Sequence, residues 1–286
     1  QLSGSCVDFT DSKHIAENAA LCDEALLETY LETGIVTPAN IRGLIAARQL
    51  FPCCFGSGLK LDGIDRLLDI LERYQYDIDL HRMVIREHAG EGRNTKIAFD
   101  EWGTWHPEAT FENNQNQRQT MRDAIFAALA LHIFYRNSDI VEFAMETQLS
   151  NLLQSLFETK GEKFYKTPTF YVMKLLKEHT GQYLTHVLPD DLDPDLDTVA
   201  TVSQDETKLT VSIVNRHLYE GREIMLNLPE DCWTITKADI VTAEQVRDVN
   251  TFDEPFHICD APFSVEDTLN FRVPKHSIVR LCLQKQ

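Results

Sequence analysis

The feature that most constrains the fold of this chain is a change in its hydrophobic pattern near residue 188. Before that point, apolar residues recur with helical spacing and are interrupted by short apolar runs. An acidic stretch, Leu188–Asp197, is expected to form a solvated linker. Beyond it, apolar and polar residues alternate in five short segments, Lys208–Asn215, Glu223–Leu228, Trp233–Val241, Thr268–Val273 and Ser277–Leu283. This alternation predicts an all-β, jelly-roll-like sandwich over residues 188–286.

The region before residue 188 combines short strands with longer helices. Buried strands are predicted at Leu50–Phe55, Lys96–Phe99 and Ile140–Ala144. Helices are predicted at Ser12–Thr33, from Pro38 after a Thr37 cap, around Ile64–Leu71, and at Leu80–His88, Thr120–Tyr135, Leu149–Phe157 and Pro168–Gly181. Alternating strands and helices are typical of an α/β barrel, but only about two of the eight units of a closed barrel are present. The sequence therefore predicts a partial (β/α)8 barrel over residues 76–187.

Charge and composition argue against several classes of function. The formal net charge is −18, so the surface repels phosphate backbones and nucleic-acid binding is not expected. No apolar run is long enough to span a bilayer and no signal peptide is recognisable, which predicts a cytoplasmic protein without membrane contact. The seven cysteines form no CxxC pair, so we expect reduced thiols and no metal site. The chain opens at Gln1 in polar sequence, which suggests an internal fragment of a longer protein.

The segment after the predicted strand Lys96–Phe99 carries candidate catalytic groups. Asp100 and Glu101 stand at the carboxyl end of this strand, the edge at which α/β barrels hold their active sites. Retaining glycoside hydrolysis needs one carboxylate as nucleophile and a second carboxyl group as acid. Trp102 and Trp105 follow at once, and indole rings pack well against the C–H faces of sugars. Glu101 is the candidate nucleophile, although a strand cap followed by two core tryptophans would give the same pattern.

The whole segment KIAFDEWGTWH, Lys96–His106, resembles the nucleophile strand of the family 51 glycoside hydrolases, which are α-L-arabinofuranosidases. The resemblance continues to the start of the predicted sandwich at TVSIVNRH and covers about residues 76–286. It implies a retaining enzyme without a cofactor, in which Glu101 is the nucleophile and Trp105 and Gln148 bind the arabinofuranosyl group. Asn151 follows at the family spacing. Three residues depart from the family pattern, namely His106, Met145 and Glu146.

Part of the family pattern has no counterpart in this sequence. The strand that carries the family's acid/base glutamate, in an Asn-Glu pair, does not precede Glu101. The nearest alternative carboxyl groups are Glu87, Glu108, Glu112 and Glu146, and none is predicted to follow a strand. We therefore expect weak or no hydrolysis from the isolated chain. Unpaired strand edges of a partial barrel also predict self-association, and the oligomers formed by family relatives imply a homo-oligomer.

Residues 5–74 resemble a different protein. The run LFPCCFGSGLKLDGIDRLLDILERY resembles the end of the G domain of translational GTPases, as in elongation factor G relatives and tetracycline-resistance ribosomal protection proteins. Ser57, Gly58 and Leu59 match the loop that contacts the guanine base, although a simple turn between a strand and a helix would look the same. The sequence contains no GxxxxGK[ST] phosphate loop and no NKxD segment, so GTP hydrolysis is not expected.

These resemblances divide the chain into a GTPase-like α/β fragment (1–75), a partial barrel (76–187) and a sandwich (188–286), with a join near Arg73–Tyr76. A chimeric or misassembled reading frame would explain the join. Three functions stay open: an arabinofuranosidase-derived chain that acts on arabinan or arabinoxylan fragments, a GTP-binding translation factor fragment, and a non-catalytic product that folds loosely. Arabinofuranoside turnover, binding of labelled GDP, and a broad unfolding transition distinguish the three.

Overall fold

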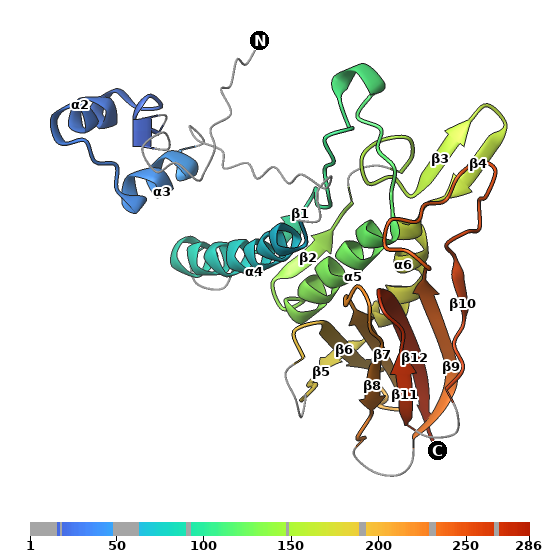
Figure 1. Cartoon of the computed structure of the whole chain (residues 1–286). Helices are drawn as coiled ribbons and strands as arrows, with labels where there is room; N and C mark the ends of the chain where they lie inside the picture. The colour runs from blue at the N-terminus through green and yellow to red at the C-terminus, as the bar shows by residue number, and fades with distance from the viewer. Residues whose placement is uncertain are drawn as a thin grey trace. The chain divides into compact units, whose positions relative to one another are not determined.

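The computed structural model describes residues 16–17, 19–47, 63–89, 93–146, 149–188, 193–228, 233–265 and 269–286. The chain forms two compact units, Gln1–Phe55 and Gly56–Gln286 (Figure 1). The predicted strand Leu50–Phe55 and the guanine-loop residues Ser57, Gly58 and Leu59 lie outside the described residues, so both predictions stay untested.

The first unit contains the helices α2 (Glu24–Thr33) and α3 (Pro38–Ala46). The sequence predicts one helix over Ser12–Thr33, and this is wrong because the backbone turns just before α2, where the Asp23 carboxylate accepts a hydrogen bond from the Leu26 amide (2.9 Å). An aspartate in this role starts a new helix instead of continuing the old one. The predicted stop at Gly34 is confirmed, since this glycine adopts φ +68° at the end of α2.

Helix α4 (Gly63–His88) opens the described part of the second unit as one continuous helix. The sequence predicts two separate helices here, which is wrong. Leu71, Tyr74 and Ile78 lie on one face of α4 and pack into the same core, because their spacing of three and four residues continues through the predicted join at Arg73–Tyr76. The division into residues 1–75, 76–187 and 188–286 stays a prediction.

Two parallel strands and two helices follow, as predicted. They are β1 (Ile97–Phe99), β2 (Val141–Ala144), α5 (Met121–Arg136) and α6 (Pro168–Leu176), the last capped by Thr167. Two short 3-10 helices, η1 (Phe111–Asn113) and η2 (Lys177–His179), complete this region. Nearly every side chain of α5 is buried, so this helix forms the centre of the core.

The predicted helix Leu149–Phe157 is wrong. Its leucines have helical spacing, but Asn151 and Leu153 adopt left-handed backbone angles (φ 58° and 25°) that a helix cannot accommodate. An irregular loop leads instead into a hairpin of β3 (Phe157–Lys160) and β4 (Lys163–Lys166). The turn of this hairpin contains Gly161 at φ +60°.

The predicted β-sandwich is confirmed by a six-stranded sheet and a two-stranded sheet. The larger sheet has the order β10-β9-β12-β7-β6-β5, and the smaller pairs β11 with β8. The five predicted segments form β7 (Lys208–Asn215), β8 (Arg222–Met225), β9 (Trp233–Thr242), β11 (Asn270–Val273) and β12 (Ser277–Lys285). Three strands of the larger sheet were not predicted, namely β5 (Tyr183–Thr185), β6 (Leu196–Val202) and β10 (Asp260–Pro262). Because β6 begins inside the acidic stretch, the linker prediction is wrong for the last residues of that stretch.

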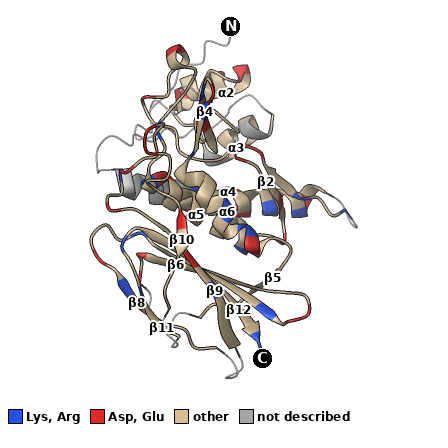
Figure 2. Ribbon diagram, turned by 90° about the vertical axis from the view of Figure 1, so that its right-hand side faces the viewer, with Lys and Arg blue, Asp and Glu red and all other residues tan. Residues whose placement is uncertain are grey.

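Successive side chains of β12 point to opposite faces of the large sheet and pack in two different cores. Ile278 pairs with Val214 and Val241, and all three belong to the core around α5 and α6. The next residue, Val279, instead packs in the core shared with β8 and β11. The sheet is therefore covered by helices on one face and by the small sheet on the other (Figures 1 and 2).

A largely buried polar cluster lies where α5 meets this sheet, with Asp197 as its partly exposed member. Nδ1 of His132 on α5 donates to Asp197 of β6 (2.5 Å). The hydroxyl of Ser212 on β7 lies 2.7 Å from Nε2 of His132 and 2.8 Å from Nε2 of His179. The other ring nitrogen of His179 contacts Thr201 (2.9 Å). These contacts join α5 and η2 to two strands of the sandwich.

We expect this cluster to make the fold acid-labile. Burial lowers the pKa of His132, and burial together with the charges of His132 and Arg280 lowers the pKa of His179 to about 3. In the unfolded chain both histidines take up a proton near pH 6.5, whereas in the folded chain they stay neutral to lower pH. The free energy of unfolding therefore falls as pH drops from about 6.5, by up to about 1.4 kcal/mol per pH unit for each histidine. Urea unfolding at a series of pH values measures this slope.

His179→Asn should flatten the slope, whereas the same change at the exposed His88 should leave it intact. An equally steep slope in both variants would assign the acid lability to other groups.

Candidate functional site

The candidate nucleophile Glu101 lies at the carboxyl edge of a parallel strand pair. Phe99, the last residue of β1, pairs with Ala144, the last residue of β2. The Met145 amide donates to the Phe99 carbonyl (2.8 Å), which continues the pairing past β2. Glu101 follows two residues after β1, and its side chain is exposed in the described part of the chain. This edge is where an α/β fold presents catalytic side chains.

The two tryptophans after Glu101 have different environments. Trp102 is buried, with its ring against Phe134 (centroids 5.4 Å apart), so it is a core residue. Trp105 is 45% exposed and its Nε1 donates to the Ala109 carbonyl (3.0 Å). Of this pair, only Trp105 has an exposed side chain, and its contact with a sugar stays a prediction.

The predicted sugar-binding residue Gln148 lies outside the described residues, so its role also stays a prediction. Asn151, three positions further on, makes two hydrogen bonds with Thr159. Nδ2 of Asn151 donates to the Thr159 hydroxyl, and the backbone amide of Thr159 donates to Oδ1 of Asn151, both at 2.7 Å. Asn151 therefore fastens the loop after β2 to the β3–β4 hairpin.

The four alternative carboxyl groups occupy different elements. Glu87 lies on α4, Glu112 lies in η1, and Glu108 accepts a hydrogen bond from the Arg118 amide (2.7 Å). The expectation that none of them follows a strand is wrong for Glu146, which comes two residues after β2. Its carboxylate oxygens are buried.

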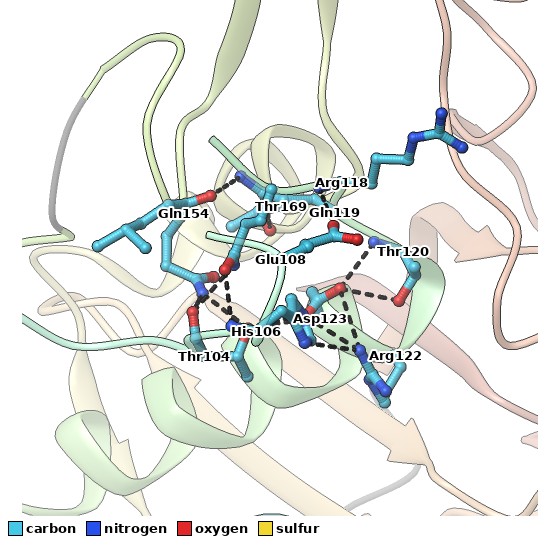
Figure 3. A network of polar contacts seen from close by, with 12 residues as sticks. Thr104, His106, Glu108, Arg118, Gln119, Thr120, Arg122, Asp123, Gln154 and Thr169 are labelled. Carbon is cyan, nitrogen blue, oxygen red and sulfur yellow. Dashed lines mark hydrogen bonds and ion pairs between the residues drawn. The ribbon is translucent and has the colours of Figure 1, made fainter. Parts of the chain in front are cut away.

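A network of buried side chains holds the loop that follows Glu101 (Figure 3). At its centre is Asp123 in the first turn of α5, which accepts hydrogen bonds from Thr104 Oγ1 (2.6 Å) and His106 Nε2 (2.7 Å). Its second oxygen accepts from the amide and hydroxyl of Thr120 (2.7 and 2.8 Å). One carboxylate thus joins the start of α5 to the loop.

Asp123 is ionised in this setting. Burial alone would raise the pKa of its carboxyl, but the hydrogen bond and charge of His106, the charge of Arg122 and the Thr104 hydroxyl together lower that pKa well below its ordinary value. The Arg122 guanidinium also lies 3.2 Å from Nδ1 of His106. A buried anion with this many donors is a rigid anchor for the segments that supply them.

The same loop is fixed from further elements at Gly103 and Thr104. The Gly103 amide donates to the Tyr74 hydroxyl of α4 (3.1 Å). Gly103 has φ +133°, and a Cβ at this position would collide with the side chain of Gln154. Gln117 (2.9 Å) and Gln154 both donate to the Thr104 carbonyl. The position of Trp105 relative to Glu101 is therefore set by α4, α5 and the loop after β2.

Most residues of this network were not predicted. The sequence marks His106 only as a departure from the family pattern. The spacing of Thr120 and Asp123 is a capping-box signal that could have identified the carboxylate. Gln117 and Gln154 carry no such signal, because their contacts depend on the paths of two irregular loops.

Three further observations concern the described part of the chain. None of its groups of His, Cys, Asp and Glu side chains is arranged to hold a metal ion. None of its helices is long and apolar enough to cross a membrane. Cys259 and Cys282 are reduced thiols.

We expect Asp123→Asn to destabilise the fold by about 3 kcal/mol, because it leaves the donors of His106 and Thr104 without their buried anion. Asp253→Asn, at an exposed turn, is the matched control and should cost less than about 0.5 kcal/mol. Urea unfolding followed by circular dichroism measures both. Equal stabilities for the two variants would contradict the central role of Asp123.

Comparison with known proteins gives a consistent picture. The family model "Alpha-L-arabinofuranosidase C-terminal domain" matches residues 100–277, starting one residue before Glu101. An intracellular exo-alpha-L-arabinofuranosidase of Bacteroides ovatus is 32% identical over 225 residues, which are 73% of this chain and 43% of that protein. A probable alpha-L-arabinofuranosidase C of Aspergillus niger is 26% identical over 222 residues, 71% of this chain and 42% of the relative.

The fold is also shared with solved structures. The GH51 arabinofuranosidase from Xanthomonas axonopodis pv. citri matches with a TM-score of 0.64 at 24% identity, covering 80% of this chain and 50% of that one. The chain thus spans less than half the length of the curated relatives it matches. Because the family model matches more than half of the sequence, the chain belongs to the family of the alpha-L-arabinofuranosidase C-terminal domain.

Proposed function

We propose that this chain is the nucleophile-bearing part of a retaining α-L-arabinofuranosidase. Its substrates are terminal, non-reducing α-L-arabinofuranosyl groups of arabinan- or arabinoxylan-derived saccharides. The observation that carries the proposal is the position of Glu101, an exposed carboxylate two residues beyond β1 at the carboxyl edge of the β1–β2 pair and near the start of the family match. The names of the relatives support this substrate class.

In this proposal, the Glu101 carboxylate attacks the anomeric carbon and forms a covalent arabinosyl intermediate, which water then hydrolyses. Trp105 packs on the sugar and Gln148 donates a hydrogen bond to it, in the roles that the family resemblance implies. The buried network of Asp123 keeps the loop of Trp105 fixed during both steps. The chemistry requires no metal and no organic cofactor.

We further propose that β1, β2, α5 and α6 form part of a (β/α)8 barrel. Two apolar side chains of the β2 region support this, since Phe143 is 59% exposed and Met145 is 46% exposed among the described residues. Further barrel strands would cover both. Without them, we expect weak hydrolysis and self-association of the isolated chain.

Covalent labelling tests the nucleophile without requiring fast turnover. An epoxide inhibitor with the arabinofuranosyl configuration should add one inhibitor mass to the peptide that contains Glu101, because the carboxylate opens the epoxide. Mass spectrometry should find no adduct in Glu101→Gln. Glu112→Gln, at an exposed position in η1, should label like the parent chain. An adduct on another residue, or none on the parent, would refute the assignment.

The resemblance of residues 5–74 to a translational GTPase supports a separate proposal, that this part of the chain binds a guanine nucleotide. It rests on the sequence alone. Equilibrium binding of labelled GDP tests it, and loss of binding in Gly58→Val, at the matched guanine loop, would support it.

A further inference from the structure

We infer that Phe111 is a binding platform for the sugar units next to the terminal arabinofuranosyl group, on the leaving side of the bond that is cleaved. The inference rests on the proposed arabinofuranosidase function and extends its site beyond Trp105. Phe111 begins η1, within the loop 107–118. In Figure 1 this loop is the green segment that extends away from β1 and α5.

The Phe111 ring stands alone in polar surroundings. Its side chain is 84% exposed and belongs to none of the hydrophobic cores of the described residues. Apart from Pro107 and Ala109, every other residue of 107–118 has a hydroxyl, amide or charged side chain, and residues 113–117 are all amides. A saccharide suits this chemistry, because its C–H faces pack on aromatic rings and its hydroxyls pair with amides, which both donate and accept. A protein partner would favour a contiguous apolar patch, which the loop lacks.

Hydrogen bonds hold the loop in shape without using the Phe111 ring. Nδ2 of Asn113 donates to the carbonyls of Glu108 (2.7 Å) and Asn116 (3.0 Å). Nδ2 of Asn116 donates in turn to the buried carboxylate of Glu158 on β3 (2.9 Å). The two residues after Asn113 both adopt φ 57°, a conformation that costs free energy outside glycine and is concentrated at functional sites. An exposed ring on a fixed loop loses little conformational freedom when a ligand packs on it.

A hydrogen bond joins this loop to Trp105, the ring proposed to pack on the arabinofuranosyl group. Nε1 of Trp105 donates to the Ala109 carbonyl (3.0 Å), and the Ala109 amide donates to the His106 carbonyl (3.0 Å). Phe111 follows Ala109 by two residues, so their Cα atoms lie within about 7 Å of each other. Trp105 itself follows Glu101 by four residues. A saccharide whose terminal group lies against Trp105 therefore has its next sugar units within reach of Phe111.

Two ligands of different length test this role. α-(1→5)-Linked arabinotriose has two sugar units beyond the terminal one, whereas methyl α-L-arabinofuranoside has none. In the full chain carrying Glu101→Gln, which prevents cleavage, arabinotriose should bind more tightly than the methyl glycoside. Phe111→Ala should weaken the binding of arabinotriose about fivefold and that of the methyl glycoside by less than about twofold. Phe111→Tyr, which keeps the aromatic ring, should bind both ligands like the parent.

NMR titration measures both affinities. The chain has three tryptophans, and the indole N–H signal of Trp105 is identified by its loss in Trp105→Phe. Phe256→Ala is the matched control, because it removes a phenylalanine that is 70% exposed and lies between β9 and β10. This variant should change neither affinity.

An equal effect of Phe111→Ala on both ligands, or no effect on either, would overturn the inference. A shift in self-association of Phe111→Ala with unchanged saccharide binding, seen by analytical ultracentrifugation, would assign the ring to contact with a second copy of the chain and also overturn it. If neither ligand binds, the inference fails, and covalent labelling of Glu101 decides whether the proposed function fails with it.

Discussion

The burial of α5 is the constraint on which the second unit depends. A helix covered on nearly every side cannot expose polar side chains to water, so each must find a partner in a neighbouring layer. Asp123, at its first turn, finds this partner in the loop after Glu101. His132, about two and a half turns later, finds it in the sandwich sheet. One helix therefore aligns the candidate site with the C-terminal sandwich.

These buried polar contacts determine geometry more than they add stability. Two charges removed from water gain little net free energy from their attraction, but a partner with wrong geometry costs several kcal/mol. The arrangement of Asp123, His106 and Thr104 is consequently difficult to change in small steps. Rigid placement of the loop is what the proposed sugar site would need, since catalysis depends on aligned reacting atoms. The sandwich and the strand edge are thus parts of one packed structure.

The sequence predicts those parts of the fold that depend on local pattern. Strands with clean alternation, such as Lys208–Asn215, and the capped helix at Pro168 are found at the expected positions. The segment Leu149–Phe157 misleads because its leucines have helical spacing while its backbone includes left-handed residues. In the candidate site, the motif alone singles out Glu101, whose role stays a prediction. Its network is not recognisable in the sequence, because Gln117 and Gln154 act across irregular loops.

The continuity of α4 has a consequence for how this protein can vary. Tyr74 reaches the Gly103 amide while Ile78, one turn later, packs into the core. Adding or deleting a single residue between them would rotate one of these side chains by about 100° relative to the other. Substitutions on the solvent face of α4 are tolerable, but its length between these two points is not adjustable. The length of α4 between Tyr74 and Ile78 therefore fixes where the loop after Glu101 lies relative to the core.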